Sequence, residues 1–449
     1  MALEGSQTIF PAEFQWGVAT AAYQIEGAAH EEGRGPSIWD DFSHTPGKTL
    51  NGDTGDEACG HYHRMPEDVA LISGLGVSHY RFSTAWPRIL PEGRLSQINS
   101  QGLAFYDRLV DTLLARGVTP ALTLYHWDLP SALQAQGGWP RRETAEAFAD
   151  YAGFMAEKLG DRVSWWITHN EPWCTAVLGH MTGEHAPGVR APRQAGQAAH
   201  HVLLSHGLAA QAVRAARPSA QVGITLNLSS VYPSGDSPQS LAAANVQDVF
   251  TNRWYLDPVL RGTYPEELSA ILGRMPEVRA GDMDVIAQPL DFLGVNYYSS
   301  QVVEADPNTG ALWPVRQVAT RARLTDMGWP VVPQGLTDLL LRLTRDYGPL
   351  PLMITENGAA YPDVPEQGQV RDQERIRYLQ EHIEAVASAM KQGADVRGYY
   401  VWSLMDNFEW AFGYSKRFGL MYVNYQTQER IPKQSAQWYR EFLRTLPRP

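Results

Sequence analysis

Two glutamates in the sequence follow short apolar runs and precede residues that are typical of turns. Glu171 lies between Asn170 and Pro172, and Glu356 lies before an Asn-Gly pair. Two carboxyl groups can hydrolyse a glycosidic bond together, because one protonates the leaving oxygen while the other attacks the oxocarbenium-like carbon. For that chemistry Glu171 is the candidate acid/base and Glu356 is the candidate nucleophile.

The two carboxyl groups need different charges, and a shared pocket can supply the difference. Partial burial and like-charge repulsion raise one pKa, whereas an adjacent cation lowers the other. Arg81, which also follows an apolar run, is the candidate cation. Taken alone, Glu171 is more often part of a strand end and turn, and Glu356 is more often a loop carboxylate. Whether Glu171 and Glu356 form a catalytic pair therefore depends on where the fold places them.

The elements that must position this pair alternate along the chain. Short β-branched or aromatic runs are followed by longer segments of helical periodicity, which is typical of repeated βα units and a parallel sheet. Apolar stripes predict helices within residues 103–114, 148–159, 336–343 and 376–390. The predicted strands are Phe14–Val18, Val77–Phe82, Pro120–His126, Val163–His169, Val222–Asn227, Phe292–Asn296, Leu352–Thr355 and Val396–Trp402.

Eight such strands predict an α/β fold, a (β/α)8 TIM barrel with long loops at its C-terminal rim. We expect residues 1–8 to form an N-terminal extension and residues 9–449 to form a single catalytic barrel domain, because no linker or repeat interrupts the composition. The longest stretches between elements, 171–193 and 297–334, both follow the C-terminal end of a strand. Active sites assemble at that rim, so the two glutamates, on the fourth and seventh strands, can face each other there.

The composition is that of a folded, acidic protein. Hydrophobic residues make up 44% and charged residues 19% of the 449, and the formal net charge is −12. We therefore expect no nucleic-acid or anionic-membrane partner. Cys59 and Cys174 are the two cysteines, and no signal-peptide pattern or long apolar run occurs, which favours a cytoplasmic protein. The 14 Trp and 20 Tyr residues hint at stacking on sugars.

Six motifs occur in a fixed order along the chain. They are residues 14–27 (FQWGVATAAYQIEG), 80–89 (YRFSTAWPRI), 125–130 (YHWDLP), 168–172 (THNEP), 296–298 (NYY) and 354–358 (ITENG). Over essentially its whole length the chain thus resembles glycoside hydrolase family 1, the β-glucosidase family. The resemblance implies a retaining β-glycosidase that uses no metal and no organic cofactor. It also implies that Glu171 is the acid/base and Glu356 the nucleophile.

The resemblance further implies roles for residues around the pair. Arg81 and Tyr298 would support the nucleophile, and residues 402–410 would recognise the glycone, the sugar on the non-reducing side of the bond. A carboxylate at Glu409 suits a neutral sugar, because it would repel a phosphorylated one. The implied substrate-binding residues are Gln24, His126, Trp127, Asn170, Asn296, Trp329, Trp402, Glu409, Trp410 and Phe418.

Several further residues have competing interpretations. Trp173 and His180 are candidates for the aglycone side of the entrance, with loop packing as an equal alternative. Cys174 is interpreted as a small buried hydrophobic residue. His61 and His63 are interpreted as structural and not metal-ligating, because no second His or Cys pair accompanies them. The Lys416-Arg417 pair is interpreted as part of a solvated turn.

The expected substrate is a β-glucoside or a short cellobiose-like oligosaccharide. Side activity on β-galactosides and β-fucosides is expected, because the implied hydrogen-bonding groups can bind either epimer of one hydroxyl. Two alternatives remain open from the sequence: a transglycosylase that uses the same covalent intermediate, and a barrel that binds sugar without cleaving it. A homo-oligomer is compatible with the sequence.

Overall fold

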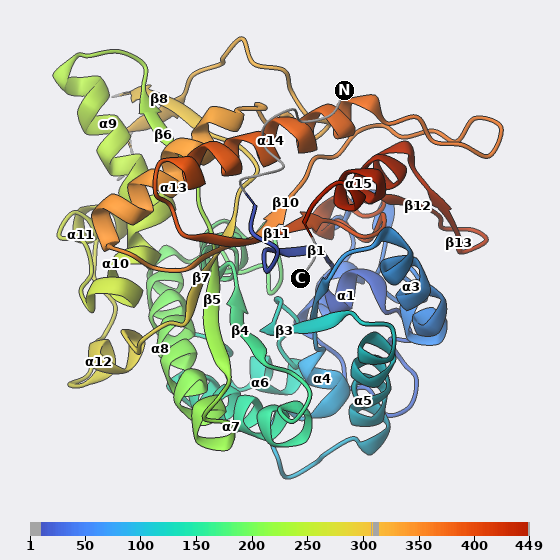
Figure 1. Cartoon of the computed structure of the whole chain (residues 1–449). Helices are drawn as coiled ribbons and strands as arrows, with labels where there is room; N and C mark the ends of the chain where they lie inside the picture. The colour runs from blue at the N-terminus through green and yellow to red at the C-terminus, as the bar shows by residue number, and fades with distance from the viewer. Residues whose placement is uncertain (1–9, 307, 309–313, 448–449) are drawn as a thin grey trace.

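The core of the molecule is a closed barrel of eight parallel strands (Figure 1). The computed structural model describes residues 10–306, 308 and 314–447, so the predicted extension at residues 1–8 lies outside the described residues. The predicted α/β barrel is confirmed. Its strands, in order around the barrel, are β1 (Gln15–Ala19), β2 (His79–Ser83), β3 (Thr119–Tyr125), β4 (Trp165–Asn170), β5 (Gln221–Asn227), β7 (Phe292–Asn296), β10 (Leu352–Asn357) and β11 (Val396–Trp402).

All eight strands lie where the sequence predicts them, and their ends differ from the prediction by at most two residues. The main difference is that β10 continues to Asn357, so Glu356 belongs to the strand and not to a loop. In the parallel register Glu356 lies beside Asn296 of β7. The strand thus fixes the direction in which this carboxyl group is presented.

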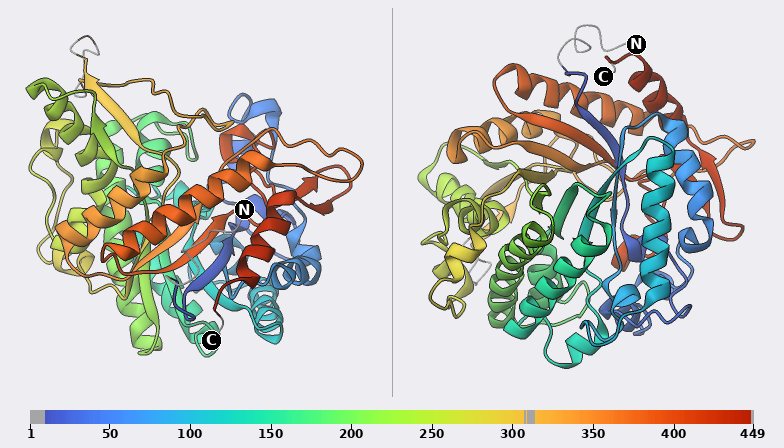
Figure 2. Two further views of the ribbon diagram at one scale, coloured as in Figure 1. Left: turned by 45° about the horizontal axis from the view of Figure 1, so that its top comes forward. Right: turned by 60° about the horizontal axis from the view of Figure 1, so that its bottom comes forward.

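Helices surround the barrel and cover its outer surface (Figure 2). The four predicted amphipathic helices are confirmed as α5, α7, α13 and α14, and their apolar stripes are largely buried. The longer helices are α3 (His61–Leu75), α5 (Ser100–Ala115), α7 (Arg142–Leu159), α8 (Pro192–Ala216), α13 (Pro333–Tyr347), α14 (Gln373–Lys391) and α15 (Gln434–Arg444). In the described part of the chain, none of the helices combines the length and apolarity needed to cross a membrane.

Side chains fill the inside of the barrel, and a glycine makes room for a tyrosine ring. A Cβ atom on Gly17 of β1 would lie 2.4 Å from Cδ1 of Tyr400, which projects from the adjacent strand β11. Tyr400 is buried and donates its hydroxyl to Oε1 of Gln15 at 3.0 Å. The barrel is therefore a packed core with its opening at one end, not a pore.

Shorter elements are inserted between the barrel units. The segment after β4, expected to be a loop, contains a wide helical turn, η2 (Cys174–Thr182), because its apolar residues are buried against α8. The other short helices are α1 (Ala22–Ile25), α2 (Ile38–Ser43), η1 (Leu50–Gly52), α4 (Trp86–Ile89), α6 (Ser131–Ala135), α9 (Pro238–Asp248), η3 (Val249–Arg253), α10 (Trp254–Arg261), α11 (Leu268–Leu272), α12 (Asp282–Ile286) and η5 (Trp410–Phe412). Strands β6 (Val231–Pro233), β8 (Gln301–Ala305) and β9 (Val315–Gln317) form one small sheet, and β12 (Met421–Asn424) and β13 (Glu429–Pro432) form another.

Candidate active site

Glu171 and Glu356 line one pocket of about 570 Å³ at the C-terminal ends of the barrel strands. Glu171 directly follows β4 and Glu356 lies in β10, so the parallel strands bring both to the same rim. Both carboxyl groups are buried, with 6% of Glu171 and 3% of Glu356 exposed. Residues that are far apart in the sequence thus form a buried carboxyl pair, as the strand positions predicted.

A cation and a hydroxyl group hold the Glu356 carboxylate. Nη1 of Arg81 donates to Oε1 of Glu356 at 2.6 Å, and the Tyr298 hydroxyl donates to Oε2 at 2.5 Å. Arg81 also donates from Nη2 to the side-chain oxygen of Asn170 at 2.7 Å. Each Glu356 oxygen therefore accepts a strong hydrogen bond, and one of the two bonds comes from a full positive charge.

Glu171 has neutral partners instead. Nδ2 of Asn296 donates to Oε1 of Glu171 at 2.6 Å, and Sγ of Cys174 donates to Oε2 at 3.0 Å. In the described part of the chain no arginine or lysine forms a salt bridge with Glu171. Cys174 is a small buried residue, as interpreted. Its thiol also contacts the candidate acid, a contact that was not predicted from the sequence; its position three residues after Glu171 was the available signal.

The two environments separate the protonation states of the pair. Burial raises the pKa of Glu171, and the charge of Glu356 raises it further, to about 7. Burial also raises the pKa of Glu356, but Arg81 and the Tyr298 hydroxyl oppose that rise. Arg81 was expected to hold the pKa of Glu356 down; the pKa instead stays above its ordinary value, because the loss of hydration outweighs the cation. The charge of Arg81 favours the ionised form of Glu356, whereas Glu171 has neutral donors, so this arrangement favours the proton on Glu171.

Several buried polar atoms in and beside the pocket have no hydrogen-bond partner among the described residues, and three of them belong to predicted glycone-binding residues. They are Oε1 of Gln24, Nδ1 of His126 and Oε2 of Glu409. His126 and Glu409 line the pocket, whereas Gln24 is held through Nε2 by Asn407 and the Phe408 carbonyl. Buried polar groups are almost always hydrogen-bonded in native proteins, so these atoms are ready to bind a polar ligand.

Glu409 is the third carboxyl group of the pocket. Burial raises its pKa to about 8, with further contributions from the charges of Glu356 and Glu171. A ligand hydroxyl would give Glu409 the hydrogen bond that it lacks and would restore part of its lost hydration. A ligand phosphate would be disfavoured, because it would bring further negative charge into a dry pocket that already holds the carboxylate of Glu356.

Aromatic rings form the walls of the pocket. Trp402, Trp410, Phe418 and Trp329 line it together with Trp127, all predicted as substrate-binding residues. The Trp127 and Trp410 rings are 4.6 Å apart, and Trp329 and Phe418 are 6.3 Å apart. Such rings offer apolar faces on which the C–H faces of a sugar can stack.

Three residues of the site have a left-handed backbone conformation that is rare outside glycine. Trp127 has a φ of +77°, Glu171 has +49° and Trp410 has +52°. Such residues persist only where the surrounding structure imposes them, and they cluster at functional sites. Trp127 is fixed in part by its Nε1, which donates to the Asn170 carbonyl at 2.8 Å.

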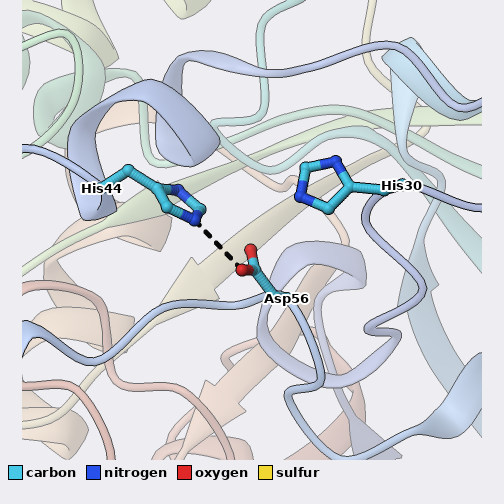
Figure 3. Close-up of side chains that lie close together, drawn as sticks. All are labelled: His30, His44 and Asp56. Atoms are coloured by element: carbon cyan, nitrogen blue, oxygen red, sulfur yellow. Dashed lines mark hydrogen bonds and ion pairs between the residues drawn. The ribbon is translucent and has the colours of Figure 1, made fainter.

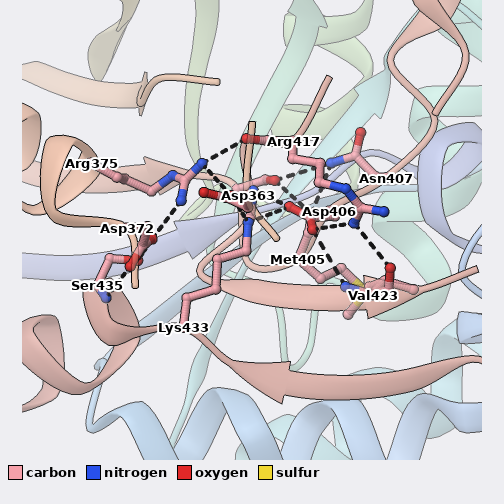
Figure 4. A network of polar contacts seen from close by, with 12 residues as sticks. Asp363, Asp372, Arg375, Met405, Asp406, Asn407, Arg417, Val423, Lys433 and Ser435 are labelled. Carbon is pink, nitrogen blue, oxygen red and sulfur yellow. Dashed lines mark hydrogen bonds and ion pairs between the residues drawn. The ribbon is translucent and has the colours of Figure 1, made fainter. Parts of the chain in front are cut away.

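Buried ion pairs fix the segment that carries Glu409 (Figure 4). Asp406 accepts hydrogen bonds from Lys433 and from Arg417, both at 2.6 Å, and Lys433 also donates to Asp363 at 2.5 Å. Because buried charges persist only when they are paired, removing one member would leave its partner uncompensated. The network therefore holds the backbone before Glu409 in a single position.

The interpretation of Lys416 and Arg417 as a solvated turn is wrong. The Arg417 side chain is 17% exposed and pairs with the fully buried Asp406, and Lys416 pairs with Asp326 at 3.0 Å. A local charge run does not reveal these distant acidic partners. Arg417 instead supports the segment that precedes Phe418 in the pocket.

The outer part of the pocket is polar and includes one of the two predicted aglycone residues. Trp173 lines the pocket, together with Gln247, Gln301 and Gln317. His180 does not line it; that residue is 1% exposed, and its Nδ1 lies 2.8 Å from the Thr175 carbonyl. The expectation for His180 is therefore corrected, because its helix turns the ring into the core.

The histidine pair at residues 61 and 63 does not form a shared site. Nδ1 of His61 is 2.8 Å from the buried carboxylate of Asp68, and Nε2 of His63 is 2.9 Å from Glu31 at the surface. His185 is a pocket-lining residue that the sequence did not single out. No local motif marks it, and the fold alone places it beside Trp127, at a ring distance of 5.5 Å.

Known proteins resemble this chain over nearly its entire length. The family described as Glycosyl hydrolase family 1 matches residues 6–446. Beta-glucosidase A of Acetivibrio thermocellus is 46% identical over 98% of this chain and 99% of its own length. A bifunctional beta-D-glucosidase/beta-D-fucosidase of Bifidobacterium breve is 50% identical over 97% and 98%, respectively. The structure of a Thermotoga maritima family 1 glycoside hydrolase complexed with a cyclophellitol analogue transition state mimic matches with a TM-score of 0.94, 47% identity and coverage of 97% and 98%.

Proposed function

Because the chain belongs to glycosyl hydrolase family 1, we propose that Glu171 and Glu356 perform the two chemical steps of its reaction. The chain is an enzyme, a retaining β-glucosidase that cleaves terminal β-D-glucosyl residues from β-glucosides. The observation that carries the residue assignment is the asymmetry of the buried pair. Glu356 is bonded to Arg81, whereas Glu171 has neutral donors and a pKa of about 7.

In the first step an oxygen of Glu356 attacks the anomeric carbon while Glu171 gives its proton to the glycosidic oxygen. The carbon–oxygen bond to the aglycone breaks, and an ester bond to Glu356 forms. Arg81 and Tyr298 keep the attacking carboxylate ionised and in place. The released alcohol carries the proton of Glu171, so the charges balance.

In the second step water replaces the aglycone. Esterification removes the negative charge of Glu356, and with it one cause of the raised pKa of Glu171. Glu171 then takes a proton from water, whose oxygen attacks the anomeric carbon and breaks the ester. Two inversions at one carbon retain the β configuration.

We propose that the unpartnered atoms of Gln24, His126 and Glu409 bind the hydroxyl groups of the glycone. Trp402 and Trp410 supply stacking faces. The carboxyl group of Glu409 cannot form an ion pair with a phosphate, so a neutral sugar is favoured. Amide, imidazole and carboxylate groups can bind either epimer of one hydroxyl, so galactosides and fucosides are side substrates. The Bifidobacterium relative with both glucosidase and fucosidase in its name supports this proposal.

A panel of p-nitrophenyl glycosides and short cello-oligosaccharides tests the substrate proposal. The β-glucoside is expected to give the highest kcat/KM, with measurable values for the β-galactoside and β-fucoside and none for α-glucosides. Adding an alcohol and comparing aryl release with free glucose measures transfer against hydrolysis. A glucose yield far below aryl release would instead favour the transglycosylase alternative.

The pH profile of kcat/KM should show loss of activity as the pH rises through about 7. Glu171 must be protonated in the free enzyme to act as an acid, and its raised pKa keeps the proton on it up to about that pH. We therefore expect the alkaline limb near pH 7, far above the ordinary carboxyl range. A profile that stays flat from pH 5 to pH 9 at constant protein stability would contradict it.

Replacing Glu409 with Gln is expected to lower kcat/KM for β-glucosides by about 10- to 100-fold, because a buried sugar hydroxyl that loses its acceptor costs about 1–3 kcal/mol. The variant keeps the side-chain shape but replaces one carboxylate oxygen with an amide donor. Glu184→Gln is the matched control, since Glu184 lines the pocket at its exposed rim. Equal losses in both variants would remove Glu409 from glycone recognition.

We also propose that residues 9–449 act as one catalytic domain and that the enzyme works in a reducing compartment such as the cytoplasm. The buried, free Cys59 and Cys174 support the second point, because the Cys174 thiol is used as a donor to Glu171. A homo-oligomeric state stays a prediction, which light scattering of the purified protein would test.

A further inference from the structure

Three potential metal ligands converge outside the catalytic pocket (Figure 3). His30 follows α1, His44 is the C-cap residue of α2, and Asp56 precedes α3. One ligand atom from each lies within 4.8 Å of the others, and in the described part of the chain this is the one group of three such residues. The three come from separate loops, so the fold and not a local motif assembles them.

We propose that His30, His44 and Asp56 bind one divalent transition-metal ion of the zinc type. Two imidazole nitrogens and one carboxylate oxygen match the ligands that zinc prefers, with a water molecule as the fourth ligand. Calcium and magnesium are disfavoured, because they select oxygen ligands. None of the three residues lines the catalytic pocket, so the site is separate from the hydrolysis.

The orientation of His44 supports metal binding. Its Nδ1 lies 2.7 Å from the backbone carbonyl of Asp40, which can only accept a hydrogen bond, so Nδ1 carries the proton. In the neutral ring Nε2 is then a free lone pair, and it points at Oδ2 of Asp56 at 3.1 Å. A lone pair that faces a carboxylate oxygen is unfavourable, so this contact requires either a proton on Nε2 or a metal ion bound by both atoms. Metal-ligating histidines are commonly oriented by such a bond from the second nitrogen.

Asp56 gives an independent indication. Its Oδ1 is shielded from solvent and has no hydrogen-bond partner among the described residues. A buried carboxylate oxygen without a donor costs free energy unless water or an ion satisfies it. His30, whose ring centroid is 6.5 Å from that of His44, completes the group and is exposed to solvent. An ion can therefore reach the site without any opening of the fold.

The position of the site indicates what the ion would do. It would connect the loops that carry residues 30, 44 and 56. The neighbouring Asp53 accepts from the Tyr414 backbone N–H at 3.0 Å, and the Tyr414 hydroxyl donates to the Thr54 carbonyl at 2.6 Å. A bound ion would thus stabilise the loop that packs against the residues following Trp410. Its role is structural.

Calorimetric titration of the chelator-treated full-length protein with ZnCl2 tests the proposal. We expect binding of one ion per chain and a rise in Tm, since a ligand that binds only the folded state stabilises it. His44→Gln and Asp56→Asn should each weaken the binding by at least about 100-fold, because losing a direct ligand costs more than losing a residue that only orients a ligand. Anomalous diffraction at the zinc edge should place the ion between the three side chains.

His63→Gln is the matched control, because His63 also pairs with a carboxylate at the surface but belongs to no group of three ligands. This variant should bind zinc as the parent does. The proposal is overturned if the parent binds no zinc, if the ion lies elsewhere in the crystal, or if His44→Gln and Asp56→Asn bind it as tightly as the parent. Circular dichroism of each variant shows whether it is folded, independently of hydrolysis.

Discussion

Glu356→Ala should lower kcat for p-nitrophenyl β-glucoside by about 10⁴- to 10⁶-fold, the range seen when a covalent nucleophile is removed. No other oxygen is held in the place of Glu356, because its position depends on β10 and on the donors Arg81 and Tyr298. The variant also leaves the buried Arg81 without its carboxylate, so its thermal stability should be measured beside its kinetics.

Two observations separate loss of the nucleophile from general damage. A small anion such as azide can enter the space left by the Glu356 side chain and attack the anomeric carbon, so it should restore aryl release and yield the α-glycosyl azide. In the parent enzyme, a 2-deoxy-2-fluoro glucoside should label Glu356, which peptide mass spectrometry can locate. Labelling of a different residue, or full activity of the alanine variant, would refute the assignment.

Glu171→Gln should lower kcat/KM for glycosides with poor leaving groups by about 10²- to 10⁴-fold, the usual contribution of a positioned general acid. Asn296 and Cys174 should keep the glutamine side chain near its place, so the change removes the proton and little else. For dinitrophenyl glucoside, whose leaving group needs no proton, formation of the covalent intermediate should remain fast. Its hydrolysis should be slow, since the base is also lost.

Three kinetic measurements check this prediction. The ratio of kcat/KM for dinitrophenyl and unactivated alkyl glucosides should rise strongly in the variant. A burst of dinitrophenol should precede slow turnover, and the alkaline limb near pH 7 should disappear. If kcat/KM fell equally for both substrates, or if the variant kept the parent pH profile, a different group would supply the proton.

The structure also explains why the proposed roles of both glutamates depend on this fold. Arg81, Asn170 and Asn296 form a chain of hydrogen bonds from Glu356 to Glu171, and each comes from a different strand or strand end. The barrel closure fixes the spacing between these strands. A change in strand register would therefore displace several members of the chain together, which is why the site is sensitive to packing far from the pocket.

The sequence by itself determined the eight strands and the two glutamates. Parallel strands are buried on both faces, so they appear as apolar runs, and the rim residues follow as polar positions at their ends. These signals are local, so they can be recognised from neighbouring residues without knowing which distant segments come into contact. The same is true of the amphipathic stripes of α5, α7, α13 and α14, which were predicted from periodicity alone.

Only the tertiary structure decided which neighbours each polar group has. The contact of the Cys174 thiol with Glu171, the burial of His180 and the pairing of Arg417 with Asp406 all depend on how chain segments pack. So does the convergence of residues 30, 44 and 56. The raised pKa values of Glu171 and Glu409 have the same origin, because hydration is lost and charges approach one another only when the whole barrel closes around them.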